Sequence, residues 1–134
     1  MSWHFLALGS GNRCPGICEL AIAVSSDELG GIVLTSSITD QKKVGAVPFQ
    51  ELDAIRVPVL VVHHESDACS HCLPGDVPLI YQRLKNAPIK KMVYVRGGGN
   101  PKGDPCGPLH WHGYIGIEKE VVDLISNWIK NPAS

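Results

Sequence analysis

The sequence predicts an α/β fold with three layers, in which four parallel strands are flanked by helices. Short runs rich in valine, leucine and isoleucine lack polar alternation, which is typical of strands buried on both faces. Segments with apolar residues at helical spacing lie between and after these runs. A chain of 134 residues with 44% hydrophobic residues can bury one core, so we expect a single domain over residues 1–134.

The four expected strands are short. They are Trp3–Leu8, Gly31–Ser36, Val57–His63 and Lys91–Val95. Pro58 would lie at the start of its strand, where a missing N–H is tolerated.

Three helical patterns and one short helix are expected between and after the strands. The first pattern has Ile17, Leu20, Ala21 and Val24 on one face; the second has Leu79, Ile80 and Leu84; the clearest has Ile117, Val121, Leu124, Ile125 and Trp128. The short helix is expected near Phe49–Ile55.

The loops that follow the strands are the expected place for chemistry, because parallel sheets bind ligands at the carboxyl ends of their strands. These loops begin at Gly9, Ser37, His64 and Arg96. The last one, Gly97–Gly113, is long and rich in glycine and proline, and such loops are more often functional than slack.

Charge and composition narrow the class of partner. The net charge is −1 and the 12 basic residues form no run longer than a Lys-Lys pair, so no partner among nucleic acids or membranes is expected. A small-molecule ligand fits better. The first residues lack the basic stretch and long apolar run of an export signal, which favours the cytoplasm. The 5 cysteines leave the periplasm open, and their odd number leaves at least one thiol unpaired within a monomer.

Acidic and basic side chains follow the last two expected strands. Asp67 comes just after His63 and His64, and the long loop supplies His110 and His112. An acid after one strand and a histidine after the next are the second and third members of a nucleophile, acid and base in chain order. The alternatives are a turn or helix-capping role for Asp67, core histidines at the end of the strand, and surface histidines in the loop.

The turn at Gly9–Asn12 joins the first strand to a helix. Backbone N–H groups of Gly9, Gly11 and Asn12 could face an anion or oxyanion there. The alternative is a tight turn that needs glycine only for its dihedral angles.

Cysteines and histidines also allow a metal interpretation. A zinc ion could use these loop residues if the two loops are neighbours: Cys69, His71, Cys72, Cys106, His110 and His112. A second close cysteine pair is missing, so we expect neither a metal nor another cofactor.

The segments "GGIVLTSSI", "IRVPVLVVHHESDAC" and "GGGNPKGDPCGPLHWHGYIGIEKEVVDLISNWI" together resemble the C-terminal half of an α/β-hydrolase. The similarity is closest to bacterial hydrolase-like proteins with a "VVHH..D.C" segment and a "GGxPP..DPC....HG..G.E" segment. The resemblance implies that Asp67 is the acid and His112 the catalytic histidine. It also implies a truncated sheet and neighbouring acid and histidine loops, so that Cys106 would form a disulfide with Cys69 or Cys72.

The nucleophile of this family lies in a Gly-x-Ser-x-Gly turn. Here Gly11 takes the place of the serine, and Ser10 lies one residue earlier. The expected function is therefore a weak ester or acyl hydrolase of the serine type, with Ser10, Asp67 and His112 as catalytic residues. The alternatives are an inactive hydrolase remnant that acts as a binding or assembly module and, third, a zinc-binding protein.

The first strand, Trp3–Leu8, is also expected to matter for assembly. The strands that would cover it in a full hydrolase sheet are missing from this sequence, and "WHFLAL" has no lysine or proline to discourage pairing. We therefore expect a homodimer through this edge strand.

Overall fold

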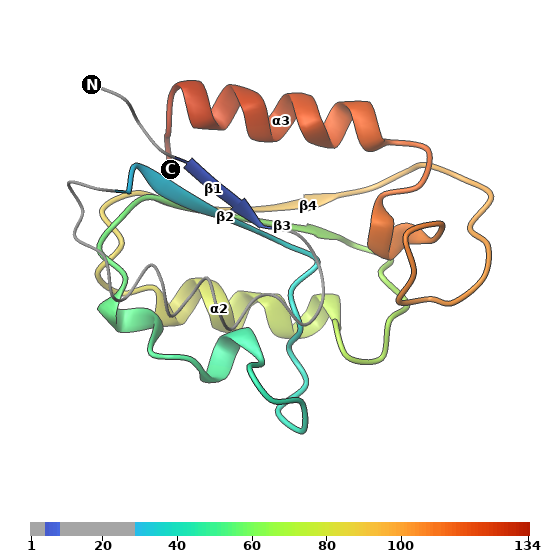
Figure 1. Ribbon diagram of the computed structural model, residues 1–134, viewed down its shortest axis with the longest axis horizontal. Coiled ribbons are helices and arrows are strands. Elements are labelled where there is room, and N and C mark those ends of the chain that lie inside the picture. Colours follow the sequence, from blue (N-terminus) through green and yellow to red (C-terminus); the bar gives the residue numbers. More distant parts are fainter. Residues whose placement is uncertain (1–4, 9–28) are drawn as a thin grey trace.

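The protein is a small α/β structure built on a parallel sheet. The computed structural model describes residues 5–8 and 29–134. The strands are β1 (Phe5–Leu8), β2 (Gly31–Thr35), β3 (Val59–His64) and β4 (Lys90–Val95), in the sheet order β1-β2-β3-β4. Figure 1 shows the sheet between α3 (Glu118–Lys130) on one face and α2 (Val77–Arg83) on the other. The expected α/β fold, with a parallel sheet and flanking helices, is confirmed.

Four strand boundaries among the described residues differ from the prediction by one or two residues: β2 ends one residue earlier, β3 begins two residues later and ends one residue later, and β4 begins one residue earlier. Two of these differences have a local reason. β3 begins at Val59 rather than Val57, because Pro58 has no N–H for the ladder and contributes only its carbonyl, which accepts from Ile32 N at 2.9 Å. β2 ends at Thr35 because Ser36 has a φ of 44°, which is left-handed and incompatible with an extended strand.

The expected short helix near Phe49–Ile55 is wrong in detail. The structure has two short 3₁₀ turns instead, η1 (Val47–Phe49) and η2 (Leu52–Ala54). Gln50 between them has φ −83° and ψ 168°, so extended backbone interrupts the helix. The expected helix through Ile17 and Val24 lies outside the described residues.

Alternate residues of the strands form two separate halves of the core. Val59 and Val61 of β3 pack with Ile80 and Leu84 near α2. Leu60 and Val62, on the opposite side of the same strand, pack with residues of α3. Because both sides of the strand are buried, its sequence is a continuous apolar run rather than an alternating one.

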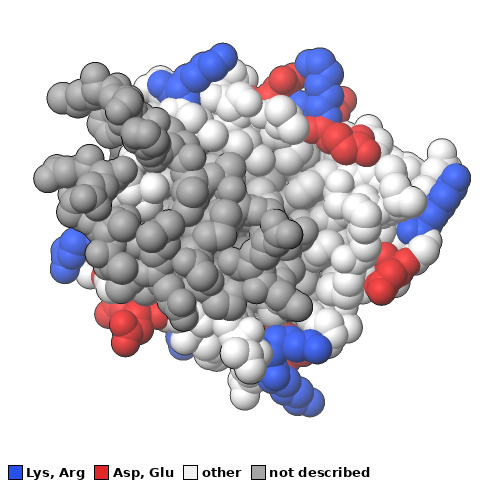
Figure 2. Space-filling view, viewed as in Figure 1, with Lys and Arg blue, Asp and Glu red and all other residues white. Residues whose placement is uncertain are grey.

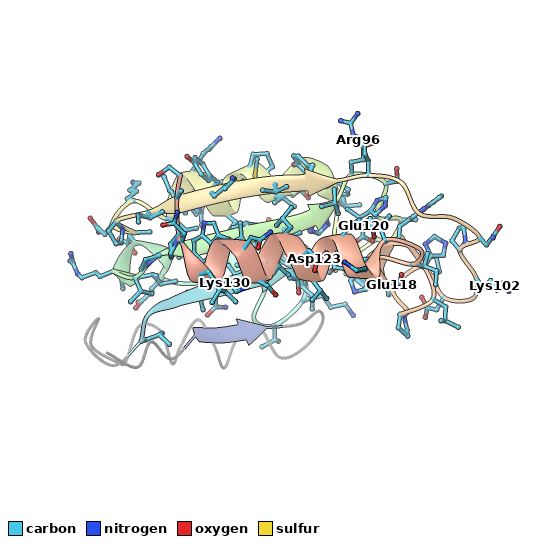
Figure 3. The ribbon with its side chains drawn as sticks, turned by 90° about the horizontal axis from the view of Figure 1, so that it is seen from above. Arg96, Lys102, Glu118, Glu120, Asp123 and Lys130 are labelled. Atoms are coloured by element: carbon cyan, nitrogen blue, oxygen red, sulfur yellow. A yellow bond between two sulfur atoms is a disulfide. The ribbon has the colours of Figure 1, made fainter. Side chains whose placement is uncertain are left out.

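Helix α3 follows the predicted helical stripe. The apolar side of the helix packs on the sheet through Ile117, Val121, Leu124, Ile125, Trp128 and Ile129. Figure 3 shows the helix lying over the sheet, with Glu120 and Asp123 labelled along it. Glu118 and Glu120 lie in its first turn, where acidic groups interact favourably with the helix dipole.

Charged side chains are dispersed over the described surface. In the face shown by Figure 2, basic and acidic side chains stand around the rim, many of them near a group of opposite sign. On α3, Lys119 Nζ and Asp123 Oδ2 form an ion pair 2.6 Å apart. In residues 5–8 and 29–134, no helix has the length and apolar character needed to cross a membrane.

The two outer strands of the sheet differ in sequence. Among the described residues, β1 and β4 each have one neighbouring strand. Lys90 and Lys91 open β4, and lysine on an edge strand discourages pairing with another chain. β1 reads Phe-Leu-Ala-Leu and carries no charge. The edge at β1 is therefore the better candidate for contact with a second copy.

We predict that two copies of the chain pair through β1, and that Leu6→Lys prevents this. Lysine in an edge strand disfavours pairing with another chain, so the variant should be a monomer with a lower melting temperature. Light scattering coupled to size exclusion measures the mass. A wild-type monomer at micromolar concentration, with mass and melting temperature unaffected by Leu6→Lys, would contradict pairing through β1.

Candidate acid–histidine site

Two loops meet at the carboxyl ends of β3 and β4. The acid loop, residues 65–72, follows β3, and the histidine loop, residues 96–117, follows β4. Because the two strands are parallel neighbours, both loops leave the same end of the sheet. Figure 3 shows how far the histidine loop extends, from Arg96 at the end of β4 past Lys102 to Glu118 at the start of α3.

Asp67 lies buried at the centre of the acid loop. The chain turns just after β3, where Asp67 N donates to His64 O at 3.1 Å. One carboxylate oxygen, Oδ1, accepts from Cys69 N at 2.9 Å. The other, Oδ2, accepts from His112 Nδ1 at 3.0 Å, and the carboxylate is 0% exposed. Asp67 therefore fixes its own loop and holds the histidine of the other.

His112 lies in a short 3₁₀ turn, η4 (Trp111–Gly113), and is 5% exposed. Gly113 allows this turn to close, because a Cβ there would lie 2.1 Å from Pro108 O. With Nδ1 donating to Asp67, the neutral imidazole keeps its lone pair on Nε2. That nitrogen can accept a proton from a hydroxyl group, while the carboxylate stabilises the resulting imidazolium.

Ser36 and Tyr114 anchor the histidine loop to the sheet, and sequence reasoning missed both. Ser36 Oγ donates to His112 O at 2.6 Å. Tyr114 Oη donates to Val62 O at 3.0 Å and accepts from Ser36 N at 3.2 Å. Burial raises the pKa of Tyr114 to about 12, so the phenol keeps its donor proton at neutral pH. A serine directly after a buried strand was the only signal in the sequence.

A disulfide joins the two loops. Of the two pairings expected for Cys106, the structure has the one with Cys69, with the Cα atoms 4.6 Å apart and the two residues 37 positions apart in sequence. Cys69 is the residue whose N–H binds Asp67. Cys106 N donates to Asp104 Oδ1 at 2.8 Å, which orders the other end of the bridge. The bridge thus closes the histidine loop onto the same turn that Asp67 occupies.

The adjacent histidines of β3 point to opposite sides of the sheet and have structural partners. His64 donates from Nε2 to Gly97 O at 2.9 Å and accepts at Nδ1 from Ser66 N at 3.0 Å. His63 donates from Nε2 to Cys72 O at 2.8 Å. The interpretation of these two as core histidines fits these contacts better than a catalytic one.

His63 nevertheless borders the site. Its Nε2 is 3.3 Å from Asp67 Oδ2, and its Nδ1 has no hydrogen-bond partner among the described residues. Burial is the main cause that lowers the pKa of His63, against the opposing effects of the Cys72 carbonyl and the Asp67 charge. The ring is therefore neutral at pH 7.

Cys72 is a buried free thiol beside the disulfide. Burial, with a smaller effect of Asp67, raises the pKa of Cys72 to about 12, so in this state it is a thiol rather than a reactive thiolate. Ligand atoms of Cys69, Cys72 and His112 lie within 4.8 Å of one another. No ion is present.

The other proposed metal ligands have different surroundings. His71 Nδ1 contacts Asp40 Oδ2 at 2.9 Å, away from the thiols. His110 packs edge-on against Trp111, with 5.0 Å between ring centroids. Neither belongs to the close group formed by Cys69, Cys72 and His112.

The expected nucleophile region lies outside the described residues. This applies to Gly9, Ser10, Gly11 and Asn12 alike, so their roles stay predictions. Of the expected catalytic residues, the structure brings together Asp67 and His112.

Comparison of the chain with protein-family models, with curated proteins and with solved structures finds no match.

We predict that the disulfide stabilises the fold by closing the histidine loop. Replacing Cys106 with serine should lower the free energy of unfolding by about 2–4 kcal/mol, because the bridge restricts a loop of this length in the unfolded chain. Denaturant unfolding measured by circular dichroism tests this. The comparison must be made without reductant; with reductant and a chelator, variant and wild type should converge. Equal stabilities under oxidising conditions would refute the prediction.

We also predict a pH effect from His63. The folded-state pKa of His63 lies below the unfolded value of about 6.5, so the unfolded chain binds more protons than the folded one. The free energy of unfolding therefore decreases as the pH is lowered. Below pH of about 6.5, this residue should reduce the free energy of unfolding by up to about 1.4 kcal/mol per pH unit, until the folded-state pKa is reached. His63→Gln keeps a donor for Cys72 O but cannot titrate. Unfolding curves from pH 8 to pH 5, in steps of ~0.5 units, should therefore be flatter for the variant; identical slopes would contradict this assignment.

Proposed function

We propose that the protein is an α/β-hydrolase-like enzyme of weak activity, acting on an ester or a similar acyl bond with Asp67 and His112 as its acid–base pair. The observation that carries the proposal is the buried bond from His112 Nδ1 to Asp67 Oδ2 at 3.0 Å, at the carboxyl ends of neighbouring parallel strands. This arrangement matches the roles of acid and base in serine hydrolases.

The geometry supports a specific proton path. His112 Nε2 accepts the proton of an attacking hydroxyl, which would be that of Ser10 or of a water molecule. Asp67 keeps the ring in the correct tautomer and stabilises the imidazolium. The same nitrogen then returns the proton to the leaving alcohol. Burial of the carboxylate strengthens this interaction, because little water competes for its oxygens.

The weakness of the activity follows from the sequence of the nucleophile turn. Gly11 stands where the family has serine, and Ser10 is one residue early. A histidine and an acid without a well-placed nucleophile retain only a small part of the rate of a complete triad. The alternative is an inactive remnant that serves as a binding or assembly module. The observation that favours it is the same replacement of the family's serine by Gly11.

We predict slow turnover of an activated ester that depends on the pair. His112→Gln and Asp67→Asn should each reduce the rate at least about tenfold, because each removes the base or its correct tautomer. His71→Gln is the matched control, since that histidine contacts Asp40 instead. Ser10→Ala separates a serine nucleophile from direct attack by water.

Labelling with a serine-directed phosphonate, followed by mass-spectrometric mapping, gives an independent result. Label on Ser10 that disappears in His112→Gln would support covalent catalysis. The absence of both label and pair-dependent turnover would favour the inactive remnant. Fast hydrolysis that survives His112→Gln would remove the acid–base pair from the mechanism.

A further inference from the structure

We propose that reduction of the Cys69–Cys106 disulfide converts the junction of the two loops into a binding site for one zinc-like divalent ion, with Cys69, Cys72, Cys106 and His112 as ligands. Cys69 and Cys106 would form either the disulfide or bonds to the metal ion, so the two states would exclude each other. This inference does not rest on the proposed hydrolytic function, because it concerns metal affinity in another redox state.

The spacing of the ligand atoms carries the argument. The sulfurs of Cys69 and Cys72 and a ring nitrogen of His112 lie within 4.8 Å of one another. In a tetrahedral zinc site, with Zn–S of about 2.3 Å and Zn–N of about 2.0–2.1 Å, neighbouring ligand atoms are about 3.5–3.8 Å apart. A contraction of about 1 Å, within reach of side-chain rotation, would complete three corners. Cys106, whose sulfur is bonded to that of Cys69 in the oxidised form, is the candidate for the fourth ligand.

The backbone already presents the two cysteines of the acid loop together. Cys69 and Cys72 have the two-residue spacing common in zinc sites. Cys72 N donates to Cys69 O at 3.0 Å, which closes this turn without using either sulfur. Cys69 N is held by Asp67. The backbone of Cys69 and Cys72 is thus held by contacts that reduction of the disulfide leaves intact.

Asp67 would orient the histidine ligand. Its carboxylate accepts from His112 Nδ1, so Nε2 is the ring nitrogen with a lone pair for a metal. A ligating histidine commonly donates its other N–H to a carboxylate, which fixes the ring and raises its basicity. The same contact that would serve a general base therefore also serves a metal ligand.

The buried thiol and imidazole groups favour a cation that prefers soft ligands. Cys69 is 2% exposed, Cys72 1% and His112 5%. Buried thiolates are costly without a compensating positive charge, and a divalent ion supplies that charge directly. Thiolate and imidazole favour zinc or copper(I) over magnesium or calcium, which prefer oxygen ligands.

The redox step needs a dithiol reductant of the thioredoxin class or its equivalent. Two electrons and two protons break the Cys69–Cys106 bond and form two thiols, while the reductant becomes a disulfide. The metal ion then replaces the protons of the ligating thiols, which pass to solvent. Oxidation by a disulfide of the same class reverses the exchange and releases the ion.

The test measures metal content against redox state. The full chain, reduced with a phosphine without oxygen, is incubated with zinc or cobalt(II) and desalted. We expect one ion per chain in the reduced protein and none in the oxidised protein. Cobalt should give a thiolate charge-transfer band and the visible bands of a tetrahedral site. Neither readout depends on ester turnover, so the failure of one proposal is distinguishable from the failure of the other.

Variants assign the ligands. Cys72→Ser should lose the retained ion but still form the Cys69–Cys106 disulfide when oxidised, which shows that it folds. Asp67→Asn should weaken the affinity by about 10–100-fold through the histidine. His71→Gln is the matched control and should bind as wild type. A Cys14→Ser, Cys18→Ser double variant should also bind as wild type, because these two thiols are not among the proposed ligands.

Four results would each overturn the proposal. They are no ion in the reduced wild-type protein, equal retention by the oxidised protein, full retention by Cys72→Ser, and loss of the ion in the Cys14→Ser, Cys18→Ser variant.

Discussion

The burial of one carboxylate constrains everything at the carboxyl end of this sheet. A carboxylate withdrawn from water costs several kcal/mol unless hydrogen-bond donors replace the water. For Asp67 the donors come from two directions: the N–H of Cys69 in its own loop and the ring of His112 in the next. Neither donor can be supplied unless the chain turns at once after β3 and the long segment after β4 folds back. The burial of this carboxylate therefore depends on the positions of both loops.

The returning loop is held independently of this carboxylate. Ser36 and Tyr114 attach its backbone to the ends of β2 and β3, and Cys106 attaches it covalently to the acid loop. Hydrogen bonds and a disulfide therefore hold the loop that carries His112. Such redundancy is expected where a side chain must keep one orientation in order to transfer a proton or to bind an ion.

The sequence predicted the elements better than their junctions. The buried strands are continuous apolar runs, as packing on both faces of a sheet requires, and α3 has apolar residues at helical spacing. The meeting of Asp67 and His112 could be expected, because parallel neighbouring strands end at one edge. Tertiary partners such as Ser36 could not be expected. A hydroxyl that donates to a carbonyl 76 positions away in the sequence produces no periodic pattern. The left-handed φ of Ser36 was equally hidden, because nothing in its neighbours requires it.

The order of the elements along the chain has a consequence for biosynthesis. Among the described elements, α3 is the helix that covers the face formed by Val33, Leu60 and Val62, and it follows all the strands in sequence. Synthesis runs from the N-terminus at about 5–20 residues per second. The face formed by Val33, Leu60 and Val62 can therefore be covered by α3 only after residues 118–130 have been synthesised, so this half of the core is the last to be completed among the described elements.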